Sequence, residues 1–203
     1  MVDSDAVRRG YDALRETYAA ERSADGRERE IIESFLESLS EPARVLDAGC
    51  GQGTPVLHRG RESMSIVGVD FSRGQLELAA TAVSEEPLVQ GDLTALPVGD
   101  AAVDAVTALH SVIHVPLEEH RTVVDEFARV LRPGGRVLVS EGPDEWRGSN
   151  PDWLDSGVEM QWHVAGADAT RDQLRAAGFA IDREWTAADE SAWVFVSATL
   201  EGS

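Results

Sequence analysis

The run from Val45 to Gly53 (VLDAGCGQG) has residue types and a spacing that could bind a cofactor. Its first two apolar residues indicate the end of a buried strand, and Asp47 follows them. Glycines then stand at every second position, at Gly49, Gly51 and Gly53. Because glycine lacks a Cβ, the chain can turn tightly and a ligand can touch the backbone. A strand, a glycine-rich turn and a helix N-terminus direct N–H groups at a ligand, so the run predicts a cofactor site.

A dinucleotide site is the alternative for this run. Its fingerprint is Gly-x-Gly-x-x-Gly or Ala, with an acidic residue about 20 positions further on. Asp70 stands at about that distance and does not discriminate, but the third glycine comes at 53 and position 54 is threonine. Asp47 would also repel a pyrophosphate in a partly dry site. A ligand with a sulfonium and an ammonium group suits this carboxylate better.

The Leu-Asp-x-Gly-x-Gly-x-Gly form resembles motif I of the class I S-adenosylmethionine (SAM) dependent methyltransferases, and the resemblance extends over nearly the whole chain. The Val-Gly-Val-Asp-Phe-Ser segment resembles the second motif, which implies that Asp70 accepts from the ribose hydroxyls and Phe71 packs on adenine. The Gly-Asp-Leu-Thr-Ala-Leu-Pro segment resembles a third element, which implies that Asp92 and Leu93 contact the adenine. A solvated charge at Asp70 and a simple turn residue at Asp92 are the alternatives.

The resemblance also places residues around the methionine part of SAM. Leu109 and His110 end a segment that resembles the family's fourth strand, which passes beneath this part. Tyr11 and Tyr18 resemble residues of a cap helix near the methionine carboxylate, although aromatic core residues of an ordinary amphipathic helix are the alternative. The implied cofactor-binding residues are Tyr11, Tyr18, Asp47, Ala48, Gly49, Cys50, Gly51, Gly53, Asp70, Phe71, Asp92, Leu93, Leu109 and His110.

Two residues are candidates for proton transfer. The Ser-Val-Ile-His-Val-Pro segment, which contains His114, resembles a pattern in one subgroup of small-molecule methyltransferases. An unperturbed histidine pKa near 6.5 suits a general base at neutral pH. Glu141, at the end of the fifth expected strand, is the second candidate, and a packing role is the alternative for His114. The histidines and the single Cys50 lack the spacing of a zinc site, so we expect no metal.

The resemblance implies transfer of a methyl group from SAM to a nucleophile on a small molecule by an SN2 step. Such a reaction depends mainly on alignment of donor and acceptor, and a base is needed only if the acceptor loses a proton. Two alternatives stay open. One is a SAM-binding regulator without transfer activity, and the other is an NAD-dependent oxidoreductase.

The composition limits the classes of partner that the protein could bind. The net charge is −19, and all 18 basic residues are arginine. We interpret this as adaptation to high internal salt, as in a halophile, because a GC-rich genome explains the arginines but not the excess of carboxylates. The charge argues against nucleic acid as substrate. The N-terminus lacks the apolar core of a signal peptide, and the longest apolar run, 105–117, is too short to span a bilayer, so we expect a cytoplasmic protein with no membrane contact.

Alternating helical and strand patterns predict the fold class α/β. We expect one SAM-dependent methyltransferase domain over 1–203 with a doubly wound, seven-stranded, mostly parallel sheet, helices on both faces and an antiparallel strand in a C-terminal hairpin. Residues 1–40 would form cap helices, and a helix is expected over 53–60. The irregular segment 142–169 is expected to form a lid-like loop. Its tryptophans could cover an apolar substrate, or could pack beneath the loop: Trp146, Trp153 and Trp162.

Overall fold

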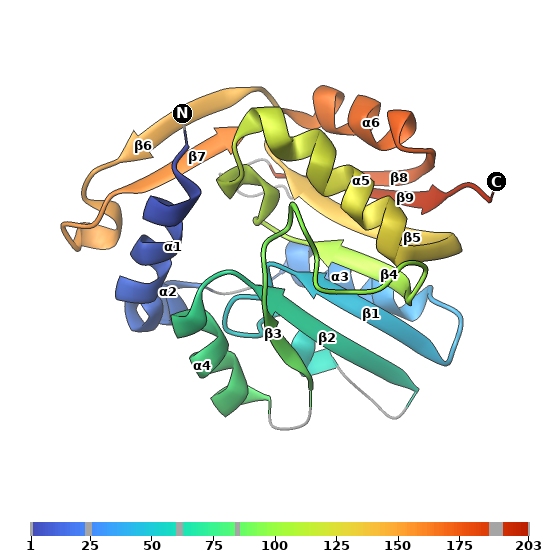
Figure 1. Cartoon of the computed structure of the whole chain (residues 1–203), viewed down its shortest axis with the longest axis horizontal. Helices are drawn as coiled ribbons and strands as arrows, with labels where there is room; N and C mark the ends of the chain where they lie inside the picture. Colours follow the sequence, from blue (N-terminus) through green and yellow to red (C-terminus); the bar gives the residue numbers. More distant parts are fainter. Residues whose placement is uncertain (1, 23–25, 60–62, 84–85, 187–192, 203) are drawn as a thin grey trace.

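A seven-stranded sheet forms the centre of the molecule, here a computed structural model (Figure 1). The structure describes residues 2–22, 26–59, 63–83, 86–186 and 193–202. The strand order is β3-β2-β1-β4-β5-β9-β8, and β9 runs in the direction opposite to the other six strands. The strands are β1 (Ala43–Ala48), β2 (Met64–Asp70), β3 (Leu88–Gln90), β4 (Val103–Ala108), β5 (Leu131–Glu141), β8 (Phe179–Thr186) and β9 (Val194–Leu200). The predicted doubly wound fold with an antiparallel C-terminal strand is confirmed.

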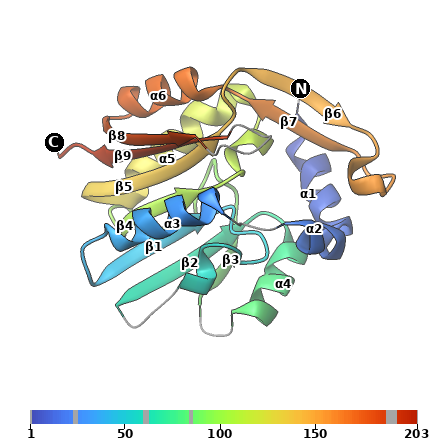
Figure 2. The same ribbon diagram turned by 180° about the vertical axis from the view of Figure 1, so that it is seen from behind.

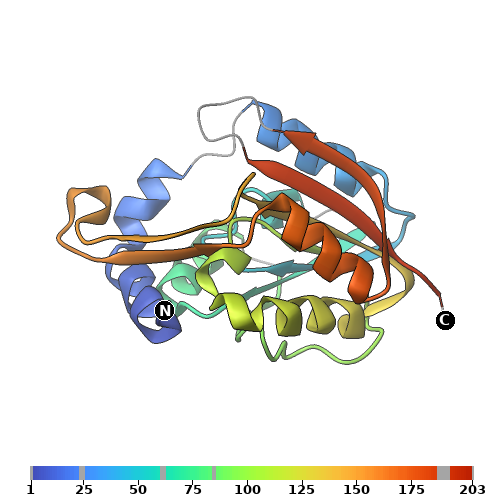
Figure 3. The same ribbon diagram turned by 90° about the horizontal axis from the view of Figure 1, so that it is seen from above.

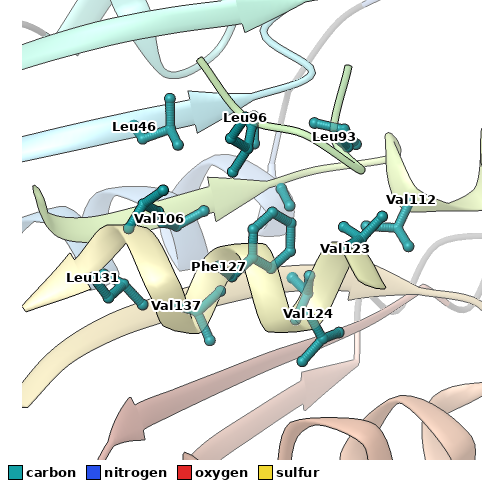
Figure 4. Packing of buried hydrophobic residues seen from close by; sticks show 14 of the residues in the cluster. Leu46, Leu93, Leu96, Val106, Val112, Val123, Val124, Phe127, Leu131 and Val137 are labelled. Carbon is teal, nitrogen blue, oxygen red and sulfur yellow. The ribbon is translucent and has the colours of Figure 1, made fainter. Parts of the chain in front are cut away.

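Helices cover both faces of the sheet, as Figure 3 shows from above. On one face lie α3 (Arg27–Glu37) and α4 (Arg73–Ala82), and on the other lie α5 (His120–Val130) and α6 (Ala167–Ala176). Phe127 of α5 is fully buried in the cluster that Figure 4 draws. Complete burial of such a side chain contributes about 1.5–3 kcal/mol, so this packing fixes α5 on the strands that carry the site.

The carboxyl ends of β1, β2, β3 and β4 meet at one edge of the sheet. β1 pairs in parallel with both β2 and β4, although β2 and β3 lie between β1 and β4 in the chain. The order of the strands therefore reverses at β1, and ligands of such sheets bind beyond the strand ends at this switch point. The glycine-rich turn leaves β1 at that position.

Two N-terminal helices and a hairpin stand over this edge (Figures 1 and 2). The helices are α1 (Ser4–Ala13) and α2 (Arg15–Glu21), and the hairpin strands are β6 (Trp146–Asn150) and β7 (Met160–Val164). The side chain of Met160 is fully buried with Val7 and Tyr11 of α1. The segment expected as an irregular lid is therefore a paired hairpin that packs on the cap helices.

The helix expected over 53–60 is not formed in the described part of that range. The chain makes turns there and a single 3-10 segment, η1 (Leu57–Arg59), while residue 60 lies outside the described residues. Gly53 has a φ of 94°, in the left-handed region, so the backbone at the expected start of this helix is not helical, and among the described residues of the range only an isolated α-helical hydrogen bond of 3.0 Å, from the Leu57 amide to the Gly53 carbonyl, is made. Within the described residues, every helix is too short or too polar to cross a membrane.

Candidate functional site

A cavity of about 700 Å³, counted with its open mouth, lies at the switch point. Many of the residues predicted from the sequence line it together: Tyr11, Tyr18, Gly49, Gly51, Asp70, Phe71, Asp92, Leu93, Leu109, His110 and His114. The remaining lining residues were not predicted as binding residues: Ser4, Gln75, Gly91, Thr94, Ser111, Val115 and Glu119. The structure thus brings together residues from the cap helix and from the ends of four strands.

A second, smaller cavity of about 360 Å³ shares four lining residues with the first: Tyr18, Gly49, Gly51 and Leu109. Its walls add the predicted residues Asp47 and Cys50, and also Arg22, which the sequence analysis did not select. A carboxylate and a guanidinium therefore line the same space. Burial raises the pKa of the Cys50 thiol, so this cysteine is a small turn residue rather than a nucleophile.

The glycine turn is shaped by close backbone contacts. Gly49, Gly51 and Gly53 all have positive φ, and a Cβ on Gly49 would overlap the side chain of Ser111. Ser111 donates a hydrogen bond of 2.8 Å to the Ala48 carbonyl, and the Gly53 amide donates one of 2.9 Å to the Cys50 carbonyl. Ala48 and Gly53 therefore support the turn, and neither lines the two cavities.

Asp70 is held with its carboxylate at the floor of the larger cavity. Its two oxygens accept from the backbone amides of Ser72 and Gly51, each at 2.8 Å. The pKa of Asp70 rises to about 6, because burial disfavours the charged form more than these donors favour it, and Asp12 adds repulsion. Asp12 in turn accepts from the Ser72 hydroxyl at 2.7 Å and the Gly74 amide at 2.9 Å, which ties α1 to the start of α4.

Asp47 is the second buried carboxylate. Its side chain is 3% exposed, and its Oδ1 accepts a hydrogen bond of 2.8 Å from the Thr107 hydroxyl. Burial, with a contribution from the charge of Asp70, raises the pKa of Asp47 to about 7, although the hydrogen bond from Thr107 acts to lower it. A bound cation would lower the free-energy cost of keeping the buried carboxylates ionised. Asp47 and Asp70 therefore form an anionic site that favours a positively charged ligand.

His114, in the 3-10 segment η2 (Val112–His114), is joined to Tyr11 by a hydrogen bond. The Tyr11 hydroxyl lies 2.8 Å from Nε2, and Nδ1 lies 3.0 Å from the Gln161 carbonyl oxygen. Because a carbonyl only accepts, Nδ1 carries the proton and Nε2 accepts from Tyr11. Burial lowers the pKa of His114 to about 4, so the ring is neutral at physiological pH.

The tryptophans of the hairpin lie outside the cavity lining. The Trp153 ring centroid is 5.6 Å from that of Tyr11, and the Trp162 centroid is 6.2 Å from that of His114. Trp146 is 52% exposed and 6.1 Å from Trp162. Trp153 and Trp162 therefore pack against Tyr11 and His114, and none of the three tryptophans lines either cavity, which agrees with the packing alternative rather than with a cover over the substrate.

The other catalytic candidate, Glu141, also lies away from both cavities. Its oxygens accept from the Gly142 amide at 2.8 Å and the Thr170 hydroxyl of α6 at 3.2 Å. Burial raises its pKa to about 7. Successive strand residues point to opposite faces, and the one before it, Ser140, instead accepts from the His110 amide at 2.7 Å. The sequence analysis correctly placed Glu141 at the end of the fifth strand, but it did not predict the face of the sheet on which this side chain lies.

His110 is strained and held by several contacts. It has a φ of 53°, which is uncommon for a residue with a Cβ, and such strain is often found at functional sites. Its Nε2 lies 3.2 Å from Glu28 of α3, which also pairs with Arg22 at 2.6 Å. Burial opposes ionisation of Glu28, but the hydrogen bonds from His110 and Arg22 lower its pKa to about 2. These contacts join the end of α2 and the start of α3 to the end of β4. α3, which was expected among the cap helices of 1–40, instead packs on a face of the sheet.

Comparison with known proteins agrees with this geometry. Residues 46–139 match the family model of the methyltransferase domain. Over 120 residues the chain is 38% identical to the methyltransferase GfsG of Streptomyces halstedii, a match that covers 55% of this chain and 42% of that protein. Over 103 residues it is 39% identical to the demethylmenaquinone methyltransferase of Mycolicibacterium vanbaalenii, with 51% and 43% covered. The chain spans less than half the length of these curated relatives.

A solved structure has the same fold over most of its length. A SAM-dependent methyltransferase of Methanosarcina mazei superposes with a TM-score of 0.72 at 19% identity, covering 84% of this chain and 98% of that one. At this level of identity the likeness concerns the fold.

Proposed function

We propose that this chain is a SAM-dependent methyltransferase that acts on a small-molecule acceptor. The observation that carries the proposal is the pair of buried carboxylates, Asp47 and Asp70, beside a glycine turn at the switch point of the sheet. The family match over 46–139 supports the same activity. A dinucleotide would bring pyrophosphate charges close to the carboxylates of Asp47 and Asp70.

The residues present fit each part of SAM. Asp70 can accept from the ribose hydroxyls, while Phe71, Asp92 and Leu93 line the same cavity where the adenine would lie. In the adjoining cavity the Asp47 carboxylate suits the ammonium group of the methionine part, and the Arg22 guanidinium suits its carboxylate. When bound, SAM supplies an electrophilic methyl group on a sulfonium.

Tyr11, supported by His114, would contact the group of the acceptor that carries a proton. We assign the group that touches the acceptor to the Tyr11 hydroxyl, because Tyr11 occupies the Nε2 atom of His114. Because the His114 ring is neutral, its Nε2 would accept the hydrogen bond from the Tyr11 hydroxyl while the Gln161 carbonyl accepts from Nδ1–H, so the Tyr11 oxygen is left to accept a hydrogen bond from the acceptor. Glu141 is left out of this role because it does not line the cavity.

The acceptor is proposed to be neutral or cationic. The described lining of the larger cavity contains the carboxylates of Asp70, Asp92 and Glu119 and contains neither lysine nor arginine. An anionic acceptor would therefore have no lysine or arginine to pair with in the described lining, and the net charge of −19 gives the same argument against nucleic acid. We further propose that this charge reflects adaptation to high salt.

Binding and transfer test the proposal separately. Thermal shift assays with SAM, S-adenosylhomocysteine (SAH) and NAD should show stabilisation by the first two only, since a ligand at 100 times its Kd adds about 2.7 kcal/mol. Methyl transfer from labelled SAM should then be measured on a panel of small alcohols, phenols and amines. Stabilisation by NAD alone would reject the proposal, while SAM binding without transfer to any member would favour a SAM-binding regulator.

A further inference from the structure

Gln75 is a buried polar residue whose side chain has no partner among the described residues. It lies in the first turn of α4, and its backbone amide donates to the Ser72 hydroxyl at 3.1 Å. Its side chain is 1% exposed, yet neither Nε2 nor Oε1 makes a hydrogen bond. Gln75 lines the larger cavity with Asp70 and Gly51. A complete side-chain amide is thus buried without a partner at the wall of the proposed cofactor site.

This arrangement is unfavourable unless a ligand completes it. Buried polar atoms in native proteins are nearly always hydrogen-bonded, and an unpaired one destabilises the fold. Ala79, one helical turn later on the same face of α4, is fully buried and apolar, so the helix pattern alone would favour an apolar residue at 75. The Oε1 atom lies 3.7 Å from the position that a Cβ on Gly51 would take, beside the glycine turn.

We infer that Gln75 binds the ribose of the cofactor together with Asp70. The inference rests on the proposed function. A carboxylate only accepts hydrogen bonds, and the oxygens of Asp70 already accept from the amides of Ser72 and Gly51. An amide both donates and accepts, so Gln75 supplies the donor that Asp70 lacks for a ribose hydroxyl oxygen. The two side chains together match a vicinal diol, which offers both donors and acceptors.

A binding role and a packing role predict different results for the melting temperature and for the SAH affinity of a Gln75 variant. Gln75→Met keeps the length of the side chain and removes the unpaired amide. The ligand-free variant should melt several degrees higher than the wild type, because an apolar group of similar shape replaces unsatisfied polar atoms. Its affinity for SAH, measured by calorimetry, should fall about tenfold. Gln173→Met, in α6 and outside both cavities, is the matched control and should change neither quantity.

Deoxy analogues identify the group that is bound. SAH and its 2′-deoxy and 3′-deoxy forms should be titrated into the wild type and Gln75→Met. The loss caused by the substitution should shrink to less than about twofold for the analogue that lacks the hydroxyl bound by Gln75, and persist for the other. An equal loss with all three ligands would overturn the ribose assignment.

The remaining outcomes separate the inference from the proposed function. If the wild type binds SAH and Gln75→Met binds it within about twofold, or if the ligand-free variant melts lower, Gln75 is a packing residue and only the inference fails. If the wild type does not bind SAH, the proposed function fails and the inference falls with it.

Discussion

Asp47→Asn should stabilise the ligand-free protein and weaken SAM binding. The carboxylate is 3% exposed, and its pKa rises from the ordinary 3.8 to about 7 because burial and the charge of Asp70 disfavour ionisation. A group whose folded-state pKa is raised contributes stability below its unfolded pKa and loses it as the pH rises through the folded value. The wild type therefore loses stability between about pH 4 and pH 7, and the loss is complete above about pH 7.

The size of the effect follows from this shift. About three pKa units correspond to about 4 kcal/mol in favour of the Asn variant near pH 8, and only about 1 kcal/mol near pH 4.5. The asparagine can still accept from the Thr107 hydroxyl, so packing is kept. For a chain of this size the difference near pH 8 corresponds to a rise in Tm of roughly 8–16 °C.

Thermal and chemical unfolding near pH 8 and near pH 4.5 would measure this difference in stability between Asp47→Asn and the wild type, with Asp172→Asn as the control. Asp172 is exposed and pairs with Arg175 three residues later, so its removal changes the same charge at the surface and should alter stability by less than about 0.5 kcal/mol. The Asn variant of Asp47 should also bind SAM at least tenfold more weakly, from the loss of about 1.5–3 kcal/mol of charge-assisted hydrogen bonding to the ammonium group. Equal stability of variant and wild type near pH 8 would refute the reasoning.

Three further outcomes are expected. Asp70→Ala should lower SAH affinity at least tenfold in calorimetry, through lost charge-assisted bonds of about 1.5–3 kcal/mol each, and unchanged affinity would reject the ribose assignment. Tyr11→Phe and His114→Ala should both leave SAM affinity within about threefold while lowering turnover on an acceptor that loses a proton; unchanged turnover would return both residues to packing roles. The melting temperature should rise from about 0.1 to about 2 M KCl as carboxylate repulsion is screened, and a flat or falling curve would contradict salt adaptation.

Periodicity and motif order were sufficient to predict the sheet, because buried parallel strands appear as short apolar runs between amphipathic helices. They could not predict the hairpin of β6 and β7. The strand Trp146–Asn150 is mostly polar and exposed, and it is defined by pairing with β7 rather than by its own pattern. Pairing of this kind depends on contacts with α1 that a local pattern does not contain. The tryptophans were placed on a loop for the same reason.

The positions of site residues could be predicted where a backbone turn fixes them. They were harder to predict where the side chain can point to either face of the sheet. Gly49 and Gly51 of the glycine turn line the two cavities with Asp47 and Asp70, while Ala48 and Gly53 of the same predicted motif do not. Glu141 was selected for its place at a strand end, but its side chain points toward α6. Gln75 was missed, although a polar residue on the buried face of α4 was a visible signal. The cytoplasmic location and the halophilic source stay predictions.

A crystal structure of the chain with SAH tests the central claim most directly. The ribose hydroxyls should lie within hydrogen-bond distance of Asp70, and the amino-acid end should lie between Asp47 and Arg22 in the smaller cavity. The sulfur should face the Tyr11 hydroxyl across the larger cavity. A complex in which SAH binds elsewhere, or in which its amino group avoids Asp47, would contradict the account.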